Sequence, residues 1–183
     1  IRFVGANKWP YPDWTHKNLG NTSQILRGSG LSKSLLSIEG QYECILYGEL
    51  FRAYNEVIHK VISRTDSEEG LISQAGDILM PTSDVTPDGL ATASVLMCSD
   101  IRLGGDINII RLKSNNNSVF IGYLLNTMKK DIMRLVTGTT IKHIYARDIK
   151  GLNLSLPSEI EEQQKIADFL TAIDNKLAAI DQQ

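Results

Sequence analysis

The sequence has few of the residues from which disulfides and metal sites are built. Its two cysteines, Cys44 and Cys98, lie in apolar runs and are not part of a C-x-x-C pair. Its three histidines, His16, His59 and His143, have no cysteine or carboxylate at the spacing of metal ligands. We therefore expect two buried, reduced thiols, and no disulfide, metal site or cofactor.

Long apolar runs are missing as well. No run approaches the ~20 residues that span a bilayer, and the N-terminus lacks the apolar core of a signal peptide. We therefore expect a cytoplasmic protein that does not enter the membrane. With 183 residues, of which 42% are hydrophobic, the chain can form one sizeable core with an appended helix.

Motifs of the common catalytic sites are also absent. The sequence contains no G-x-S-x-G, no H-E-x-x-H and no Asn or Asp followed by two prolines and an aromatic residue, the signature of adenine methyltransferases. We therefore expect no catalytic residue. One enzymatic function stays open, that of a magnesium-dependent nuclease that would use Asp88 and the D-x-K element formed by Asp148 and Lys150.

The charge of the chain is unevenly distributed. The formal net charge is −2, but residues 158–183 hold six Asp or Glu and only two Lys, so residues 1–157 carry a net charge of +2. Between Lys129 and Lys150 there are six Lys or Arg and two Asp, with His143 among them. This segment is the best candidate for contact with phosphate, although an ordinary solvated helix face would also explain its first basic residues.

Hydrophobic patterning predicts an α+β fold. Short apolar runs bounded by turn residues predict strands at 44–47, 78–80, 93–97, 107–112 and 152–156. Helical spacing predicts a brief helix at 57–62 and the main helix near 118–136, with Ser118 as its N-cap. We expect a mixed, mostly antiparallel sheet that displays loops on one side and is packed against the main helix.

The C-terminal segment predicts a projecting helix. Pro157 ends the preceding strand, and Ser158 with Glu161 has the spacing of a capping box. Apolar residues then follow at intervals of four, three, four and three, as in the seam of a coiled coil: Ile166, Leu170, Ile173, Leu177 and Ile180. Such a seam favours a partner helix, although packing on its own domain stays open.

The same region carries a specific resemblance. Leu156-Pro157 and residues 162–170, EQQKIADFL, are similar to the end of a target recognition domain in the specificity subunit of type I restriction-modification enzymes. Weaker points of similarity occur along the rest of the chain, at Ile1-Arg2-Phe3, Trp14, Leu19-Gly20, Arg27 to Lys33, Gly76 to Leu79 and Thr137 to Thr140. Members of that family typically carry two recognition domains and two long helices, whereas this sequence contains one of each.

The resemblance implies a non-catalytic subunit that binds double-stranded DNA. It implies a recognition domain at 1–157, which would read one half of a bipartite target, and a helical coiled-coil arm at 158–183. Methyltransferase subunits would dock through the helix and bring the restriction subunit with them, and a second copy of the chain could pair with the exposed seam. A small homodimeric DNA-binding regulator and a pure scaffold also stay open as functions, although no helix-turn-helix pattern is present.

Loops that follow the predicted strands supply the candidate DNA-binding residues. They combine cations, hydroxyl groups and carboxylates, which can contact phosphates or base edges. The loop after Gly138 is our first choice. The candidates are Arg27, Ser29, Lys33, Glu49, Arg52, Tyr54, Thr82, Ser83, Asp84, Thr139, Thr140, Lys142, His143 and Arg147.

Overall fold

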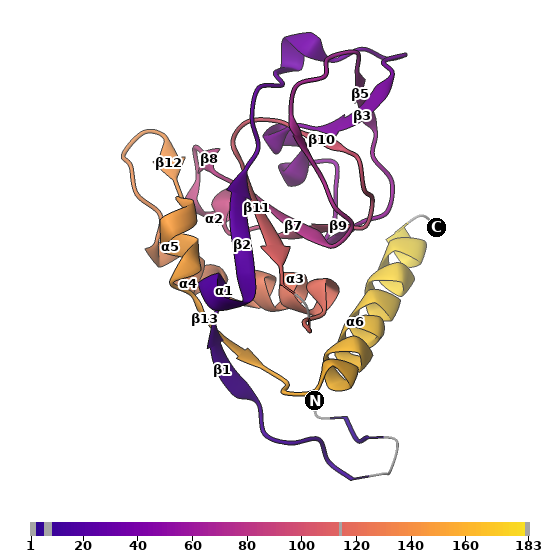
Figure 1. Ribbon diagram of the computed structural model, residues 1–183, viewed down its shortest axis with the longest axis vertical. Helices are drawn as coiled ribbons and strands as arrows, with labels where there is room; N and C mark the ends of the chain where they lie inside the picture. The colour runs from indigo at the N-terminus through magenta and orange to yellow at the C-terminus, as the bar shows by residue number, and fades with distance from the viewer. Residues whose placement is uncertain (1–2, 6–8, 114, 182–183) are drawn as a thin grey trace.

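The computed structural model describes residues 3–5, 9–113 and 115–181, so Ile1 and Arg2 of the family resemblance lie outside the described residues. A five-stranded sheet in the order β2-β11-β7-β9-β4 forms the centre of the molecule (Figure 1). Within this sheet β4 and β9 pair in parallel and the other neighbouring strands are antiparallel, which confirms the predicted mixed, mostly antiparallel sheet. The strands are β2 (Ser23–Arg27), β11 (Ile107–Leu112), β7 (Asp77–Pro81), β9 (Ser94–Leu96) and β4 (Val57–Ile58).

Both faces of this sheet are buried, which explains why strands such as β7 and β11 are mostly apolar in the sequence and do not alternate strictly. Successive side chains of a strand point to opposite faces. In β7, Ile78 and Met80 therefore belong to one core cluster and Leu79 to the other. In β11, Ile110 belongs to the first cluster and Ile109 to the second.

A second sheet of four strands, in the order β5-β3-β10-β6, packs against the second cluster through Ile45 and Leu103. Its strand β3 ends at Ile45, two residues before the predicted end, because Tyr47–Phe51 forms the 3-10 helix η2. Two further pairs of strands, β1 with β13 and β8 with β12, lie beside the main sheets. The strands of this paragraph are β5 (Ser63–Thr65), β3 (Tyr42–Ile45), β10 (Arg102–Leu103), β6 (Leu71–Ile72), β1 (Thr15–Asn18), β13 (Asn153–Leu156), β8 (Ser83–Asp84) and β12 (Lys142–His143).

Short helices cover the first cluster and each contributes a buried apolar side chain to it. They are α1 (Leu19–Thr22), α2 (Pro87–Leu90), α3 (Ser118–Thr127), α4 (Lys129–Arg134) and α5 (Ala146–Lys150), with Leu19, Leu90, Phe120, Ile132 and Ile149 in the core. The 3-10 helix η1 (Lys33–Leu35) follows the loop after β2. Together with the sheets, these helices confirm the α+β fold class.

The predicted helix at 57–62 is wrong. Val57 and Ile58 form β4, which pairs with Val95 and Leu96 of β9. Ile58 and Val61 are buried in the second cluster, whereas Ile62 is exposed. Six residues, four of them β-branched, are too short a window to separate a helix from an edge strand and its following loop.

The predicted main helix is two helices. Its N-cap is Asn117 rather than Ser118, because the Asn117 side chain accepts a hydrogen bond from the Phe120 N–H at 2.8 Å. The helix stops at Met128, whose backbone (φ −90°, ψ 19°) leaves the α-helical region, and α4 then ends at Arg134. The break redirects α4 so that Ile132 is fully buried in the first cluster.

The C-terminal helix α6 (Ile160–Asp181) begins two residues later than the capping box predicts. The Glu159 carbonyl accepts from the N–H groups of Glu162 and Gln163, while the Ser158 hydroxyl donates to Asp13 O at 3.5 Å. Ser158 lies beside that carbonyl because β13, which ends just before Ser158, pairs with β1, which begins just after Asp13. The predicted Ser158–Glu161 cap is therefore replaced by a hydrogen bond from Ser158 to the N-terminal segment.

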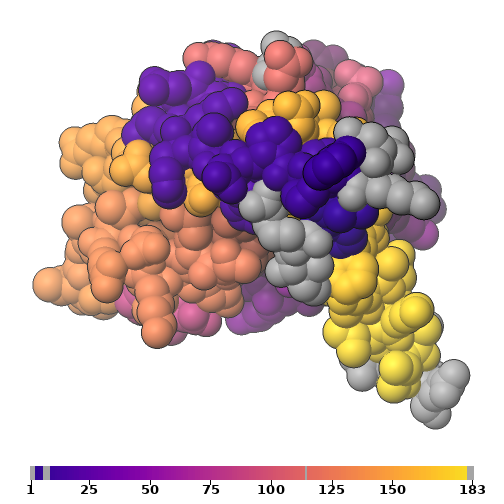
Figure 2. Space-filling model, turned by 90° about the horizontal axis from the view of Figure 1, so that it is seen from below, coloured from indigo at the N-terminus to yellow at the C-terminus, as the bar shows by residue number. Residues whose placement is uncertain are grey.

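The first half of α6 packs on the domain and its second half projects (Figures 1 and 2). Ile166 packs against the first cluster, and Tyr123 of α3 donates a hydrogen bond of 2.5 Å to Asp174. Beyond that point Leu177 and Ile180 of the predicted seam are 55% and 64% exposed. Within the described residues, no helix has the length and apolar character needed to cross a membrane.

Candidate nucleic-acid interface

Four segments that are far apart in the sequence meet around the β10–β11 turn and the start of β11, on one hollowed face of the molecule. They are the end of β2 with its loop, the region of η2, the β7–β8 connection with β8, and β12 with the start of α5. They line two adjacent clefts of about 780 Å³ and about 680 Å³, which we call the first and second cleft. Tyr47, Asp84 and Asp106 line both clefts, so the two hollows are neighbours.

The wall of the first cleft is the ribbon of β8 and β12. Asp84 pairs with Lys142 and Ser83 with His143, and the Ser83 hydroxyl lies 2.9 Å from His143 Nδ1. The turn that leads into β12 needs a glycine at Gly138, which has a φ of 103° and whose added Cβ would meet Ile141 O at 2.2 Å. The sequence around Gly138 therefore fixes the position of His143.

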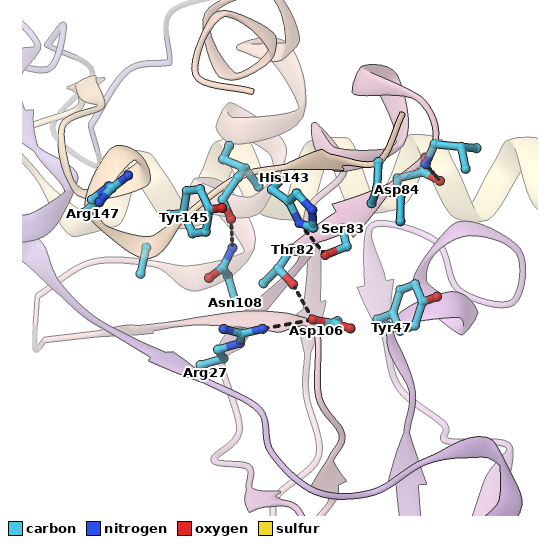
Figure 3. A pocket seen from close by; sticks show the side chains of 14 residues that line it. Arg27, Tyr47, Thr82, Ser83, Asp84, Asp106, Asn108, His143, Tyr145 and Arg147 are labelled. Carbon is cyan, nitrogen blue, oxygen red and sulfur yellow. Dashed lines mark hydrogen bonds and ion pairs between the residues drawn. The ribbon is translucent and has the colours of Figure 1, made fainter. Parts of the chain in front are cut away.

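Aromatic rings continue this wall toward α5. The His143 and Tyr145 rings are stacked with centroids 6.2 Å apart, and the Arg147 guanidinium lies 5.1 Å from the centre of the Tyr145 ring. The Arg147 side chain is 81% exposed, with Asp148 at 3.6 Å. Figure 3 shows Arg147 and Tyr145 at one end of the cleft, away from Arg27.

The floor of the first cleft is formed by hydrogen-bonded residues at the end of β2, just after β7 and at the start of β11 (Figure 3). Asp106 Oδ1 accepts from Arg27 Nη2 at 3.0 Å and from the Thr82 hydroxyl at 3.1 Å. Asn108 of β11 is buried, and its Nδ2 donates to Ile144 O at 3.2 Å. Arginine, carboxylate, hydroxyl and amide groups are thus held together beside open space.

The structure brings nine of the fourteen predicted DNA-binding residues to these clefts. The first cleft is lined by Arg27, Thr82, Ser83, Asp84, His143 and Arg147, and the second by Lys33, Glu49, Arg52 and, again, Asp84. Five candidates line neither cleft: Ser29, Tyr54, Thr139, Thr140 and Lys142. Of these, Ser29, Thr139 and Thr140 are exposed, and Lys142 Nζ donates to Gly138 O at 2.8 Å.

Three candidates make contacts inside the protein. Tyr54 packs on the second cluster and accepts a hydrogen bond from the Ile62 N–H, and burial raises its pKa to about 12. The Glu49 carboxylate accepts from Leu46 N and from the Ser63 hydroxyl. Thr82 is buried, so its hydroxyl acts through Asp106.

Among the polar and aromatic residues that line the first cleft, sequence reasoning missed four, namely Tyr47, Asp106, Asn108 and Tyr145. Asn108 lies inside a strand, where a polar residue gives no sign that its face opens on a cleft. Asp106 follows Gly104-Gly105, a pattern typical of an ordinary turn. Its φ of 60° is unusual for a residue other than glycine, and only the structure reveals it.

Nothing in the part of the chain that the structure describes suggests a metal centre. There, no group of three or more His, Cys, Asp or Glu side chains is placed to hold a metal ion. Asp88 and Asp148, the carboxylates that a nuclease would use, are therefore not part of such a group. The described residues of the clefts offer hydrogen-bonding and stacking groups.

Comparison with known proteins gives one family. A model of the type I restriction modification DNA specificity domain matches residues 11–183. A putative type I specificity subunit of Mycoplasma pneumoniae is 26% identical over 173 residues, which cover 90% of this chain and 40% of that protein. The putative type I restriction enzyme MjaX specificity subunit of Methanocaldococcus jannaschii is 31% identical over 173 residues, which cover 89% of this chain and 37% of that protein.

A solved structure shares the fold. The crystal structure of the type I restriction-modification system S subunit from M. genitalium matches with a TM-score of 0.68 and 22% identity, and the match covers 93% of this chain and 41% of that chain. The chain thus spans about two fifths of the length of the curated relatives it matches.

Proposed function

Because the chain belongs to the family of type I restriction modification DNA specificity domains, we propose that its two clefts read part of a double-stranded DNA target. The observation that carries this proposal is the convergence of four separate segments on one face, with arginine, hydroxyl, amide and carboxylate groups beside aromatic rings. These are the groups that contact phosphates and base edges in protein–DNA complexes.

Different residues suit contacts with phosphates and contacts with base edges. Cations that reach out from the clefts, such as Lys33, Arg52 and Arg147, are all exposed and suit phosphate contacts, which position the protein. Groups held within the first cleft, such as Ser83 and Asp84, suit base edges, which carry the sequence information. The chain would thus supply recognition without catalysis.

We also propose that residues 1–157 act as the recognition domain and residues 158–183 as a docking arm. Methyltransferase subunits, and through them the restriction subunit, would supply modification and cleavage. The names of the curated relatives, which are specificity subunits, support this assignment. The exposed seam residues Ile173, Leu177 and Ile180 support a helical partner for the arm, either from a second copy or from another part of the full chain.

A selection from a random duplex pool tests the recognition function. The full natural chain is mixed with the pool together with its methyltransferase partner, and bound duplexes are sequenced. We expect one short sequence to be enriched. The double variant Ser83→Ala with Asp84→Ala should reduce this enrichment. Lys176→Ala is the control, because Lys176 lies on α6 and lines neither cleft, and it should leave the enrichment unchanged. A pool that stays random after binding would contradict the proposal.

A further inference from the structure

Arg27 is held in the first cleft by a chain of contacts. Its Nη2 donates to Asp106 Oδ1 at 3.0 Å, and the same oxygen accepts from the buried Thr82 hydroxyl at 3.1 Å. The Thr82 N–H also donates to the Asp106 carbonyl at 2.8 Å. Asp106 is thus fixed through both its side chain and its backbone (Figure 3).

Folding stability does not account for this arrangement. The Arg27 side chain is 65% exposed and that of Asp106 is 42% exposed, and ion pairs so open to water contribute little to stability. Asp106 holds a φ of 60°, a left-handed conformation that aspartate tolerates better than most residues with a side chain, so this turn can present a carboxylate to Arg27. An ion pair that adds little stability yet orients an exposed arginine is better explained by what the arginine binds.

We propose that Arg27 reads a guanine from the major groove and that Asp106 is its positioning residue. A guanidinium group has five N–H donors, and the contact with Asp106 uses one of them. A pair of the remaining donors fits the N7 and O6 acceptors of guanine, the base that presents two acceptors in the major groove. This inference rests on the proposed recognition function and deepens it, because it assigns one residue to one base.

The fixed orientation is what separates base reading from phosphate contact. A free arginine can turn toward the phosphate backbone, whereas Asp106 holds the Arg27 guanidinium at the cleft floor and reduces the rotamer freedom lost on binding. Arg147, which lines the same cleft, gives the matched contrast. It is 81% exposed and lies over the Tyr145 ring, which suits a phosphate contact.

The experiment compares three variants of the full natural chain, Arg27→Ala, Asp106→Asn and Arg147→Ala, by measuring affinity for the selected duplex and for duplexes changed at each base pair. Asparagine tolerates the left-handed backbone, so Asp106→Asn removes the charge without forcing a new conformation. Thermal unfolding of each variant shows that the fold is kept.

Arg27→Ala is expected to lose the preference for guanine at one position, about 5- to 150-fold, while the other positions keep theirs. Asp106→Asn is expected to reduce the same preference at the same position. Arg147→Ala is expected to weaken binding to all duplexes alike and to reduce the slope of log affinity against log salt by about 0.9.

Two results would overturn the inference while leaving the recognition function in place. One is an Arg27→Ala variant whose affinity falls equally for all duplexes and whose slope of log affinity against log salt is reduced, which is the behaviour of a phosphate contact. The other is an Arg27→Ala variant that keeps every base preference of the wild type. A wild-type chain without any sequence preference would instead remove the recognition function on which the inference rests.

Discussion

Cys44 is fully buried in β3, and burial, followed by the negative charge of Glu49, raises the pKa of its thiol to about 11 from an ordinary value near 9. Below pH 9 both the folded and the unfolded chain keep this proton. Between pH 9 and 11 only the unfolded chain loses it, so the free energy of unfolding should fall as the pH rises, by at most about 1.4 kcal/mol per pH unit.

Urea unfolding with reductant at several values between pH 8.5 and 10.5 measures this slope. Cys44→Ala is expected to flatten it, even if the smaller side chain lowers stability at every pH. Cys98→Ala is the control, because Cys98 is only partly buried, with its thiol bonded to His59 O. Equal slopes in the wild type and in Cys44→Ala would rule out Cys44 as the source.

At the residue scale, the sequence could nominate polar residues after strands but could not say where their side chains are used. Arg27 and Ser83 follow this rule and line the first cleft. Glu49 follows it equally well, yet its carboxylate binds Leu46 N and Ser63 within the protein. The contact with Ser63 depends on a neighbour 14 positions away, which a local pattern does not contain.

At the element scale, the contact between α3 and α6 gives a second prediction. Tyr123 donates a hydrogen bond of 2.5 Å to Asp174 and also contacts the Thr171 hydroxyl at 3.4 Å. Tyr123→Phe removes both bonds and keeps the ring. We expect a loss of about 1 kcal/mol, since the site is partly exposed, and faster amide hydrogen exchange over residues 171–177.

Tyr145→Phe is the matched control, because Tyr145 lies on the first cleft and not on α6. It should leave exchange in α6 unchanged. If Tyr123→Phe also left the exchange of residues 171–177 unchanged, the apolar packing of α6, and not this hydrogen bond, would be what anchors the helix.

Elements with a strong pattern could be predicted, and elements decided by tertiary contacts could not. The strand at 107–112 matches β11 at both ends, because its apolar residues, interrupted by Asn108 and Arg111, suit a strand buried on both faces. The helix at 57–62 failed because pairing with β9 decided the conformation of Val57 and Ile58. The predicted cap at Ser158 is wrong because the Ser158 hydroxyl donates instead to the carbonyl of Asp13, 145 residues away.

At the scale of the whole molecule, the candidate site exists only because the chain folds. Arg27 and Arg147 are 120 positions apart in the numbering, and both line the first cleft. The central sheet brings them together, since β2 pairs with β11 while β8, which follows β7, pairs with β12. The sequence therefore predicted the α+β class and nominated nine residues that line the clefts, but it did not predict the clefts that group them.

The projecting half of α6 gives the last prediction. Ile173, Leu177 and Ile180 are 38%, 55% and 64% exposed along one stripe, whereas Ile166 and Leu170 nearer the domain are half-buried. Each large aliphatic side chain contributes about 1.5–3 kcal/mol when fully buried. We therefore expect this chain to form a weak, concentration-dependent homodimer through the stripe, as the heptad spacing predicts.

Sedimentation equilibrium on the wild type, Leu177→Glu and Ala179→Glu tests this. Leu177→Glu places a charge in the stripe and should leave a monomer at all concentrations. Ala179→Glu adds the same charge at an exposed position about 160° away around the helix, taking roughly 100° per residue, and should dimerise like the wild type. Two results would contradict this prediction, namely a wild type that stays monomeric at all concentrations and a dimer that Leu177→Glu does not weaken. Either result would mean that the stripe does not bind the helix of a second copy, so that a different partner would have to cover it.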